Sequence, residues 1–420
     1  MIKKILTYSF GEVLVKGTSF LAVLLYSRLI LPHEYGTLGF LNSLVSFLPF
    51  ILTFYYLYAY VRFSVEVKEK RLISTYFFMG LVLNMFYFLS ALLIYFFFIQ
   101  QYNIELKYFI LSITSSSMIF LFQILQMYYR SRGLANTYIK FSIFYSILGL
   151  ILNFSCLLYF EDNVFAMLLS SSITSLLVTI VAYGILRNSI HWKLFDVSLV
   201  KKILKYTIPL VPGAIALLVF SQSDKIVLIN YISKDELGVY TLAFTLGLSM
   251  SYLGSAFFMS YQPLFYEKIA QNLRLEIEQQ FWKNMIFILL ALLLSFLVIY
   301  IAYYFVDSKY SGGLKYALII ALAYNFITFS QMMELHLTYI KKTLLVSFVY
   351  GVGGILTLVL LFTLIPLYGT KGAAMSLLIS AFVISVCMYV LAQKKMYLNY
   401  NKSMLFGYYV VTLSIGGILL

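Results

Sequence analysis

Six charged residues interrupt long apolar stretches, and their types make them the first candidates for chemistry. They are Glu12, Lys16, Arg28, Asp224, Lys225 and Glu334. An ionisable group inside a membrane is costly, so it usually faces a partner or an aqueous cavity. There a carboxylate can take up a proton or a cation, and a basic group can hold an anion such as a phosphate. The same residues can instead form structural ion pairs, and the sequence leaves both interpretations open.

The position of each residue favours one interpretation. Glu12 and Lys16 are four residues apart on one helix face, which favours a local ion pair over a phosphate contact by Lys16. Arg28 is equally suited to reach the outer interface or to bind an anion. Asp224 lies too deep in its stretch to reach water easily, so we expect it to line a cavity. Lys225 follows it directly and is expected to point elsewhere around the helix.

No catalytic arrangement accompanies these charges. Glu334 lies with His336 near the inner end of its stretch, where an interface position is favoured over ion coupling. The three histidines lie in unrelated regions, and the sequence has no phosphate-binding loop of the kind that hydrolyses nucleotides. Cys156 and Cys387 lie far apart within apolar stretches, so we expect them to pack in the core without a disulfide or a metal. The sequence therefore predicts neither an enzyme nor a cofactor.

The composition requires lipid as the solvent for most of the chain. Hydrophobic residues make up 62% of the 420 residues and charged residues 11%, and the mean hydropathy is +0.92. A soluble domain carries about 25% charged residues. The formal charge of +14 falls in short clusters between apolar stretches, without a basic stripe or tail, which argues against a nucleic-acid partner. We therefore expect an all-α polytopic membrane protein, with membrane lipid as one of its partners.

Twelve stretches are long and apolar enough to cross the bilayer as helices, which takes about 20 residues each. They are residues 9–31, 36–61, 73–99, 107–129, 138–160, 164–186, 206–231, 237–261, 284–306, 314–338, 344–366 and 371–392. A further stretch, 404–420, is short and forms either a thirteenth helix or an apolar end. Residues 262–283 combine apolar and charged side chains at a helical period, which predicts an amphipathic helix at the membrane interface.

The distribution of basic residues predicts the orientation. With the N-terminus in the cytoplasm, 22 of the 30 Lys and Arg residues fall in inner segments and 5 in outer segments. Such an excess on the cytoplasmic side is typical of membrane proteins. The count supports both the twelve spans and a cytoplasmic N-terminus.

The spans divide into two halves of six with similar turns. Residues 34–36 and 236–238 both read Glu-x-Gly after the first span of a half, and both predict a tight turn. Because six is even, the second half enters the membrane from the same side as the first, which makes the halves parallel repeats. The expected domains are a six-helix lobe at 1–190, a cytoplasmic linker at 191–205, a second six-helix lobe at 206–395 and an apolar tail at 396–420.

Four segments carry a family resemblance. They are RLILPHEYG at 28–36, AYVRF at 59–63, LKYTIPLVP at 204–212 followed by SDK at 223–225 and GVY at 238–240, and IPLYGTKGAA at 365–374. In them the chain resembles the polysaccharide (O-antigen type, Wzx-like) flippases of the multidrug/oligosaccharidyl-lipid/polysaccharide exporter superfamily. The third and fourth segments are the most specific, and the resemblance covers essentially the whole chain.

The resemblance implies a fold and a function. The fold is two parallel six-helix lobes around a central cavity, as in the multidrug and toxin extrusion (MATE) transporters, in a bacterial cytoplasmic (inner) membrane. The function is to flip a polyprenyl-pyrophosphate-linked oligosaccharide to the outer leaflet by alternating access. The product would feed the synthesis of O-antigen, lipopolysaccharide or capsule, alongside other polysaccharide assembly proteins. The substrate-binding candidates are then the basic residues Lys16, Arg28, Lys225 and Arg62. The ion-coupling candidates are Asp224, Glu12 and Glu334, with H⁺ or Na⁺ as the ion.

Two other functions stay open. A cation-coupled drug exporter belongs to the same superfamily, but we would expect it to carry its own acidic patterns in the first and seventh spans, and these are not clear here. A membrane-embedded polysaccharide polymerase is disfavoured, because polymerases of this pathway resemble one another in having a sizeable outer loop. The outer loops of this sequence are all short.

Overall fold

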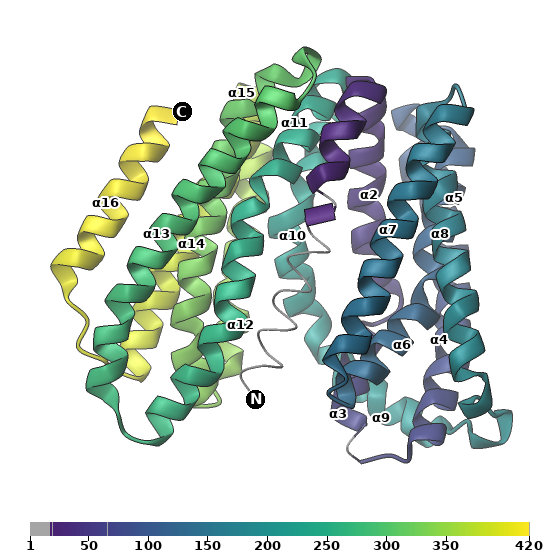
Figure 1. The fold of residues 1–420 in the computed structure, drawn as a ribbon, viewed down its shortest axis with the longest axis horizontal. Helices are drawn as coiled ribbons and strands as arrows, with labels where there is room; N and C mark the ends of the chain where they lie inside the picture. The colour runs from purple at the N-terminus through teal and green to yellow at the C-terminus, as the bar shows by residue number, and fades with distance from the viewer. Residues whose placement is uncertain (1–16, 19, 65, 420) are drawn as a thin grey trace. The chain divides into compact units, whose positions relative to one another are not determined.

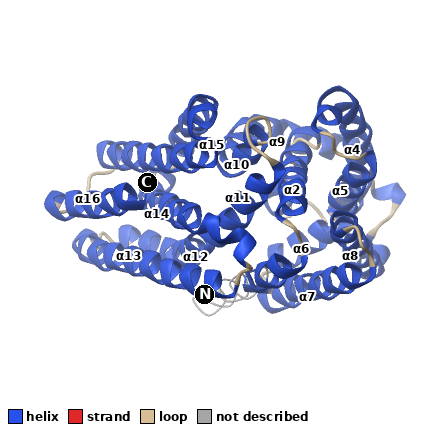
Figure 2. Cartoon of the chain, turned by 90° about the horizontal axis from the view of Figure 1, so that it is seen from above, coloured by secondary structure: helices blue, strands red, loops and turns tan. Residues whose placement is uncertain are grey.

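The computed structural model describes residues 17–18, 20–64 and 66–419, and this part of the chain consists of helices and connecting loops without a strand (Figures 1 and 2). Its α-helices are α2 (Pro32–Leu52), α3 (Tyr60–Phe63), α4 (Glu69–Ile94), α5 (Leu106–Met118), α6 (Phe120–Ser131), α7 (Ala135–Tyr159), α8 (Asn163–Leu186), α9 (Val197–Thr207), α10 (Val211–Leu228), α11 (Lys234–Gly247), α12 (Ser249–Ala270), α13 (Arg274–Phe305), α14 (Leu314–Tyr339), α15 (Thr343–Lys395) and α16 (Lys402–Leu419). The prediction of an all-α membrane protein is confirmed.

The number of spans differs from the prediction. Ten helices of the described residues are long and apolar enough to cross a membrane, and a bent pair, Val197–Ala216 with Leu218–Leu228, would make eleven. The count of twelve is therefore not confirmed. Part of the difference lies in α15, whose 53 residues cover two predicted spans. Its backbone is non-helical at Gly369 (φ 55°, ψ −131°), a conformation that glycine adopts without steric cost, so two spans meet there.

The chain forms two compact units. The composite unit combines the residues up to Gly36 with those from Val219 onward, and the continuous unit is Thr37–Leu218. This division differs from the lobes 1–190 and 206–395 expected from the sequence, and those lobe boundaries stay a prediction. The helix Phe20–Leu29 joins the composite unit, where the Tyr310 hydroxyl donates to the carbonyl oxygen of Ile30 at 3.0 Å.

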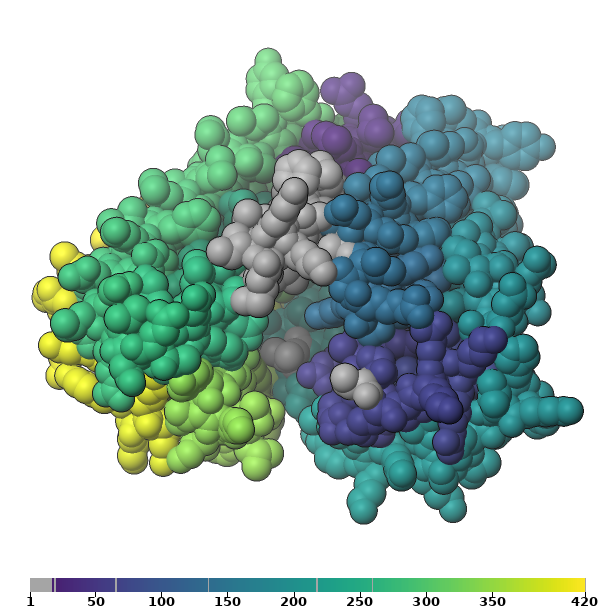
Figure 3. All heavy atoms as spheres, turned by 60° about the horizontal axis from the view of Figure 1, so that its bottom comes forward, coloured from purple at the N-terminus to yellow at the C-terminus, as the bar shows by residue number. Residues whose placement is uncertain are grey.

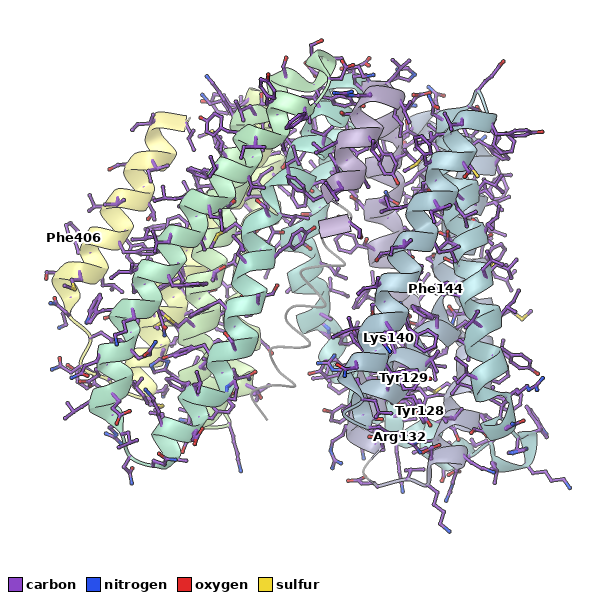
Figure 4. All side chains as sticks on the ribbon, in the orientation of Figure 1. Tyr128, Tyr129, Arg132, Lys140, Phe144 and Phe406 are labelled. Atoms are coloured by element: carbon purple, nitrogen blue, oxygen red, sulfur yellow. The ribbon has the colours of Figure 1, made fainter. Side chains whose placement is uncertain are left out.

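Helix α14 is the centre of the composite unit, where it contacts α11, α12, α13, α15 and α16. Its buried Asn325 donates to the carbonyl oxygen of Ile288 on α13 (3.1 Å) and accepts from the Tyr408 hydroxyl on α16 (2.6 Å). The apolar tail is therefore a packed helix, and it is one of the ten candidate spans. Phe406, on the other face of α16, points away from the unit, as expected for a side chain that faces lipid (Figure 4).

The amphipathic interfacial helix predicted at 262–283 is wrong. Helix α12 continues to Ala270, a short turn follows, and α13 begins at Arg274. Most of the apolar residues on which the prediction rested, such as Phe265 and Phe281, are buried within the composite unit, whereas Leu264 and Leu273 are exposed. The buried ones show a helical period because they face neighbouring helices, not a membrane surface.

The predicted Glu-x-Gly turns are also wrong, because both segments are the first turns of helices. Pro32 and Glu34 begin α2, where the Glu34 carboxylate accepts the backbone N–H of Leu31 at 2.7 Å. Ser233 caps α11 through the N–H of Glu236. Gly36 lies against the start of α11 and Gly238 against the start of α2, so each glycine lets the other helix approach. The two equivalent helix starts of the predicted repeats thus contact each other reciprocally.

The continuous unit is built around α8, which contacts α5, α6 and α7. A cluster of buried apolar side chains joins α3, α4, α6, α8 and α9, with Tyr60 and Tyr76 among its largest members. At the start of α9 the Asp196 carboxylate accepts the N–H of Ser198 at 2.9 Å and forms an ion pair with Arg71 on α4. These contacts fasten α9 to the rest of the unit.

Candidate functional site

A pocket of about 690 Å³ with a mixed polar and apolar lining lies in the continuous unit, and its volume falls in the range of small-molecule sites. Its lining combines arginine, glutamine and aromatic side chains with apolar ones. The lining residues are Pro49, Phe50, Thr53, Tyr55, Tyr56, Leu57, Tyr58, Val61, Arg62, Gln123, Gln126, Met127, Arg130 and Tyr206. They come from α2, the short 3₁₀-helix η1 (Tyr56–Ala59), the turn between these two, α3, α6 and α9.

A break in the second predicted span shapes this pocket. The span 36–61 is not one helix, because α2 ends at Leu52 and the chain turns before η1. Phe54 and Tyr55 both have left-handed backbone angles (φ 55° and 53°), which cost bulky residues about 1–2 kcal/mol each. Irregular backbone at membrane depth is tolerated where it lines a cavity. Tyr56, 2% exposed, anchors the following turn in the core.

Two arginines lie at this pocket. Arg62 on α3 is exposed and forms an ion pair with Glu66 one turn further on, at 2.6 Å. Arg130 at the end of α6 is exposed and has no carboxylate partner among the described residues. Figure 3 brings this end forward, and the indigo segment that holds α3 reaches the surface there. The structure thus brings one predicted substrate-binding residue, Arg62, together with Arg130, for which the sequence analysis predicts no role in binding.

The polar lining contributed by α6 was missed in the sequence, although a signal exists. Gln123, Gln126 and Arg130 are spaced by three and four residues within an otherwise apolar segment, so they share one face of a helix. In the structure all three line the pocket, and the Gln126 amide donates to the Ser142 hydroxyl at 3.2 Å. A polar stripe on an apolar helix is the pattern expected of a side that faces a cavity.

The second group of functional candidates is the charged pair on α10. Asp224 and Lys225 are both buried in the composite unit, at 0% and 4% exposure. One Asp224 carboxylate oxygen accepts from the Lys225 ammonium at 3.2 Å and from the Lys225 backbone N–H at 2.8 Å. The other oxygen accepts from the Tyr240 hydroxyl of α11 at 2.8 Å. The ammonium also lies 3.5 Å from the centroid of the Phe244 ring.

This arrangement corrects the expectation for Lys225. Its side chain does not point elsewhere around the helix but folds back onto the preceding Asp224. The long side chain can do so because the alternative is an unpaired charge in an apolar interior, which is far more costly. Both charges have partners, so the pair has the features of a buried structural ion pair.

Glu334 occupies a different environment in the same unit. It lies on α14, is partly buried, and its carboxylate accepts from the Tyr350 hydroxyl of α15 at 3.0 Å. The neighbouring His336 is buried and bonds to the Tyr400 hydroxyl at 2.8 Å, in the segment that leads to α16. Among the described residues, the Glu334 carboxylate therefore has one hydrogen-bond partner, a neutral hydroxyl group, in contrast to Asp224.

The other predicted residues lie apart from these groups. The Arg28 side chain is exposed near the end of the helix Phe20–Leu29. Glu12 and Lys16 lie outside the described residues. Within the part of the chain that the structure describes, no cluster of three His, Cys, Asp or Glu residues could hold a metal ion.

Solved structures of other proteins have a similar fold. The chain is similar to an inward-facing multidrug resistance MATE family transporter of the MOP superfamily (TM-score 0.71, 14% identity), with 93% of this chain and 97% of that chain covered. It is also similar to the lipid II flippase MurJ in an inward closed conformation (TM-score 0.73, 13% identity; 97% and 90% covered). A third match is the bent form of the MATE transporter VcmN from Vibrio cholerae (TM-score 0.56, 13% identity; 95% and 98% covered). The protein thus has the MATE- and MurJ-like membrane-transporter fold.

The family follows from the sequence comparison. A model of the polysaccharide biosynthesis protein family matches residues 1–268, and the chain belongs to this family. No curated protein sequence matches the chain.

Proposed function

We propose that this protein flips a polyprenyl-pyrophosphate-linked oligosaccharide from the cytoplasmic to the outer leaflet of a bacterial cytoplasmic membrane, for surface polysaccharide synthesis. Membership of the polysaccharide biosynthesis family and a transporter fold support the general class. The same fold serves a flippase of another lipid-linked substrate, lipid II. In this role the protein moves its substrate and makes or breaks no covalent bond.

The observation that carries the proposal is the charge of the pocket in the continuous unit. Both charged residues that line it, Arg62 and Arg130, are basic. An arginine binds a phosphate through several directed hydrogen bonds and a full positive charge. A cationic drug would be repelled by the same lining. The pocket therefore favours an anionic, phosphate-bearing substrate over the cargo of a cation-coupled drug exporter.

The orientation of the protein is part of the proposal. Arg132, directly after α6, and Lys140 on α7 lie toward the end of the continuous unit where α3 and α9 are found (Figures 1 and 4). Basic residues concentrate on the cytoplasmic side of membrane proteins. We infer that this end, and the N-terminus, face the cytoplasm, where lipid-linked oligosaccharides are assembled.

Coupling to H⁺ or Na⁺ is a second part of the proposal. Among the predicted candidates, Glu334 fits a coupling role better than Asp224, because its described partner is one neutral hydroxyl group. Asp224 is already neutralised by Lys225. Glu12, Lys16 and Arg28 stay candidates from the sequence alone.

A reconstituted transport assay tests the function. The protein is placed in proteoliposomes with lipid-linked oligosaccharide extracted from the native host, and arrival in the opposite leaflet is measured with a lectin or a glycosidase. We expect the wild type to transport the lipid and Arg62→Ala/Arg130→Ala to transport it at least about tenfold more slowly. Arg62→Lys/Arg130→Lys should keep part of the transport rate, because it keeps the charge. Lys140→Ala, at the same end but outside the pocket lining, is the matched control and should transport normally.

Each alternative outcome has a clear meaning. Failure of the wild type to move any glycan lipid would overturn the proposed function. Extrusion of a cationic dye, unaffected by the arginine variants, would support the drug exporter instead. For coupling, we expect Glu334→Gln to abolish the stimulation of transport by an imposed H⁺ or Na⁺ gradient, and an unchanged response would remove Glu334 from the mechanism.

A further inference from the structure

Three aromatic rings form a row along the pocket of the continuous unit. The rings of Tyr55 and Tyr58 are stacked, with centroids 4.9 Å apart and an interplanar angle of 22°. The Phe50 ring continues the row, 5.0 Å from Tyr55 at an angle of 30°. Tyr58 is 53% exposed, whereas the neighbouring Tyr56 is 2% exposed. The ring row (Phe50, Tyr55 and Tyr58) therefore presents aromatic surface to the pocket, and it is not simply part of the core.

The backbone keeps the ring row in place. Phe54 and Tyr55 hold left-handed angles between the end of α2 and η1, and an unbroken helix would instead place Phe50 and Tyr55, which are five residues apart, on different faces. Strained backbone of this kind persists where the surrounding structure requires it, and it is concentrated at binding and active sites. The buried Tyr56 and Tyr60 supply the anchorage, because both pack in the apolar cluster of the unit.

Hydrogen-bonding groups complete the pocket. Gln123 and Gln126 bring amides that can both donate and accept, a combination that suits hydroxyl groups. Gln126 uses its nitrogen to bond Ser142 and keeps its oxygen as an acceptor. Arg62 and Arg130 add two guanidinium groups, of which Arg62 is paired with Glu66 and Arg130 has no carboxylate partner among the described residues. Aromatic faces, amides and guanidinium groups together suit a ligand that has apolar ring faces, hydroxyl groups at its edges and a negative charge.

We propose that this pocket is a binding subsite for the phosphate-linked sugar of the substrate. The apolar face of the sugar ring packs on the ring row, its hydroxyl groups bond to Gln123 and Gln126, and its phosphate lies at Arg62 and Arg130. An aromatic drug would leave Arg130 without a counter-charge among the described residues, and a bare phosphate would leave the ring row unused. This inference rests on the proposed function and assigns the recognition of the glycan to the continuous unit.

Binding measurements on the full-length protein in lipid nanodiscs test the subsite. The probes are undecaprenyl pyrophosphate and the same lipid carrying the host oligosaccharide. We expect Tyr55→Ala/Tyr58→Ala to weaken binding of the glycan-bearing lipid by about tenfold and to leave undecaprenyl pyrophosphate unchanged. Tyr55→Phe/Tyr58→Phe should bind like the wild type, because it keeps the rings. Phe144→Ala, which removes an exposed ring of α7 outside the pocket lining, is the matched control (Figure 4).

The arginines separate two sources of negative charge. Arg62→Ala/Arg130→Ala should weaken the binding of both lipids, because both carry the pyrophosphate. If this variant weakens only the glycan-bearing lipid, the arginines bind an acidic sugar, and the placement of the phosphate is wrong.

The outcomes also separate this inference from the proposed function. A wild type that binds neither lipid overturns the proposed function. A wild type that prefers the glycan-bearing lipid, together with a tyrosine double variant that keeps this preference, overturns the subsite alone. Should the double variant not fold, Tyr58→Ala is measured instead, since its exposed side chain contributes little to the core.

Discussion

The reciprocal contact of Gly36 and Gly238 leads to a sharp prediction about stability. A methyl group at Gly36 would lie 2.1 Å from the carbonyl oxygen of Lys234, and one at Gly238 would lie 1.8 Å from that of Pro32. Non-bonded carbon and oxygen atoms need about 3.3 Å, so the starts of α2 and α11 would have to separate by more than about 1 Å. Both obstacles are backbone atoms, which cannot rotate away. We expect the free energy of unfolding of each Gly→Ala variant to fall by about 1–3 kcal/mol, which is the usual effect of overpacking.

A matched control separates crowding from any general effect of alanine. At Gly351, in α15, an added Cβ would meet no atom within 4 Å, and alanine is favoured over glycine in a helix by about 1 kcal/mol. The assay is the midpoint of thermal unfolding in detergent, followed by the fraction that stays monodisperse after heating. Gly36→Ala and Gly238→Ala should unfold below the wild type, and Gly351→Ala at or above it. Equal midpoints for all three variants would refute the close contact of the two helix starts.

Three further predictions concern charge and backbone. Hydrogen bonding, above all from the Ser198 hydroxyl, lowers the pKa of Asp196 from 3.8 to about 2. A depressed pKa stabilises the fold above about pH 4 and ceases to do so as the pH falls through 2. Asp196→Asn should therefore be less stable than the wild type at pH 7, by up to about 1 kcal/mol, with a difference that disappears near pH 2 in unfolding midpoints. Asp224→Asn should lower the free energy of unfolding by about 3–5 kcal/mol, because it leaves the Lys225 charge buried and unpaired. The double variant Asp224→Asn/Lys225→Met should recover most of this loss. A single variant as stable as the wild type would exclude a buried ion pair. Gly369→Ala should lower the free energy of unfolding by about 1–2 kcal/mol, because alanine is strained at the positive φ of this residue. Crowding adds little, since the added methyl group would only touch Ile232 at 3.5 Å. An unchanged midpoint would show that the break in α15 tolerates alanine.

The sequence predicted the helices better than their ends and their environments. Residues 404–420 illustrate this: the apolar run indicated either a helix or an end, and the docking of Tyr408 on Asn325 is what makes it a packed helix. The prediction of an interfacial helix at 262–283 was wrong for a related reason. Its helical period was read correctly, but an apolar stripe looks the same whether it faces lipid headgroups or other helices.

The functional residues divide in the same way. Arg62 and the Asp224–Lys225 pair were identified because a charge in an apolar sequence is conspicuous. Arg130, which lines the pocket with Arg62, and Tyr240, which bonds to Asp224, were not identified. Nothing in their sequence positions distinguishes them from other arginine and tyrosine residues. Lys225 was misplaced since the position of a backbone atom on a helix does not determine where a long, flexible side chain ends.

By itself, the sequence determined that this is an all-helical membrane protein, because apolar stretches of this length admit no other solvent and no other backbone structure. Its motifs also indicated the family to which the chain belongs. Only the tertiary structure decided which charges are neutralised in pairs and which line a pocket, and where a predicted span breaks to expose a row of rings. Membrane insertion depends on summed hydrophobicity, a property of the chain, whereas a binding site depends on distances between residues that only packing brings together.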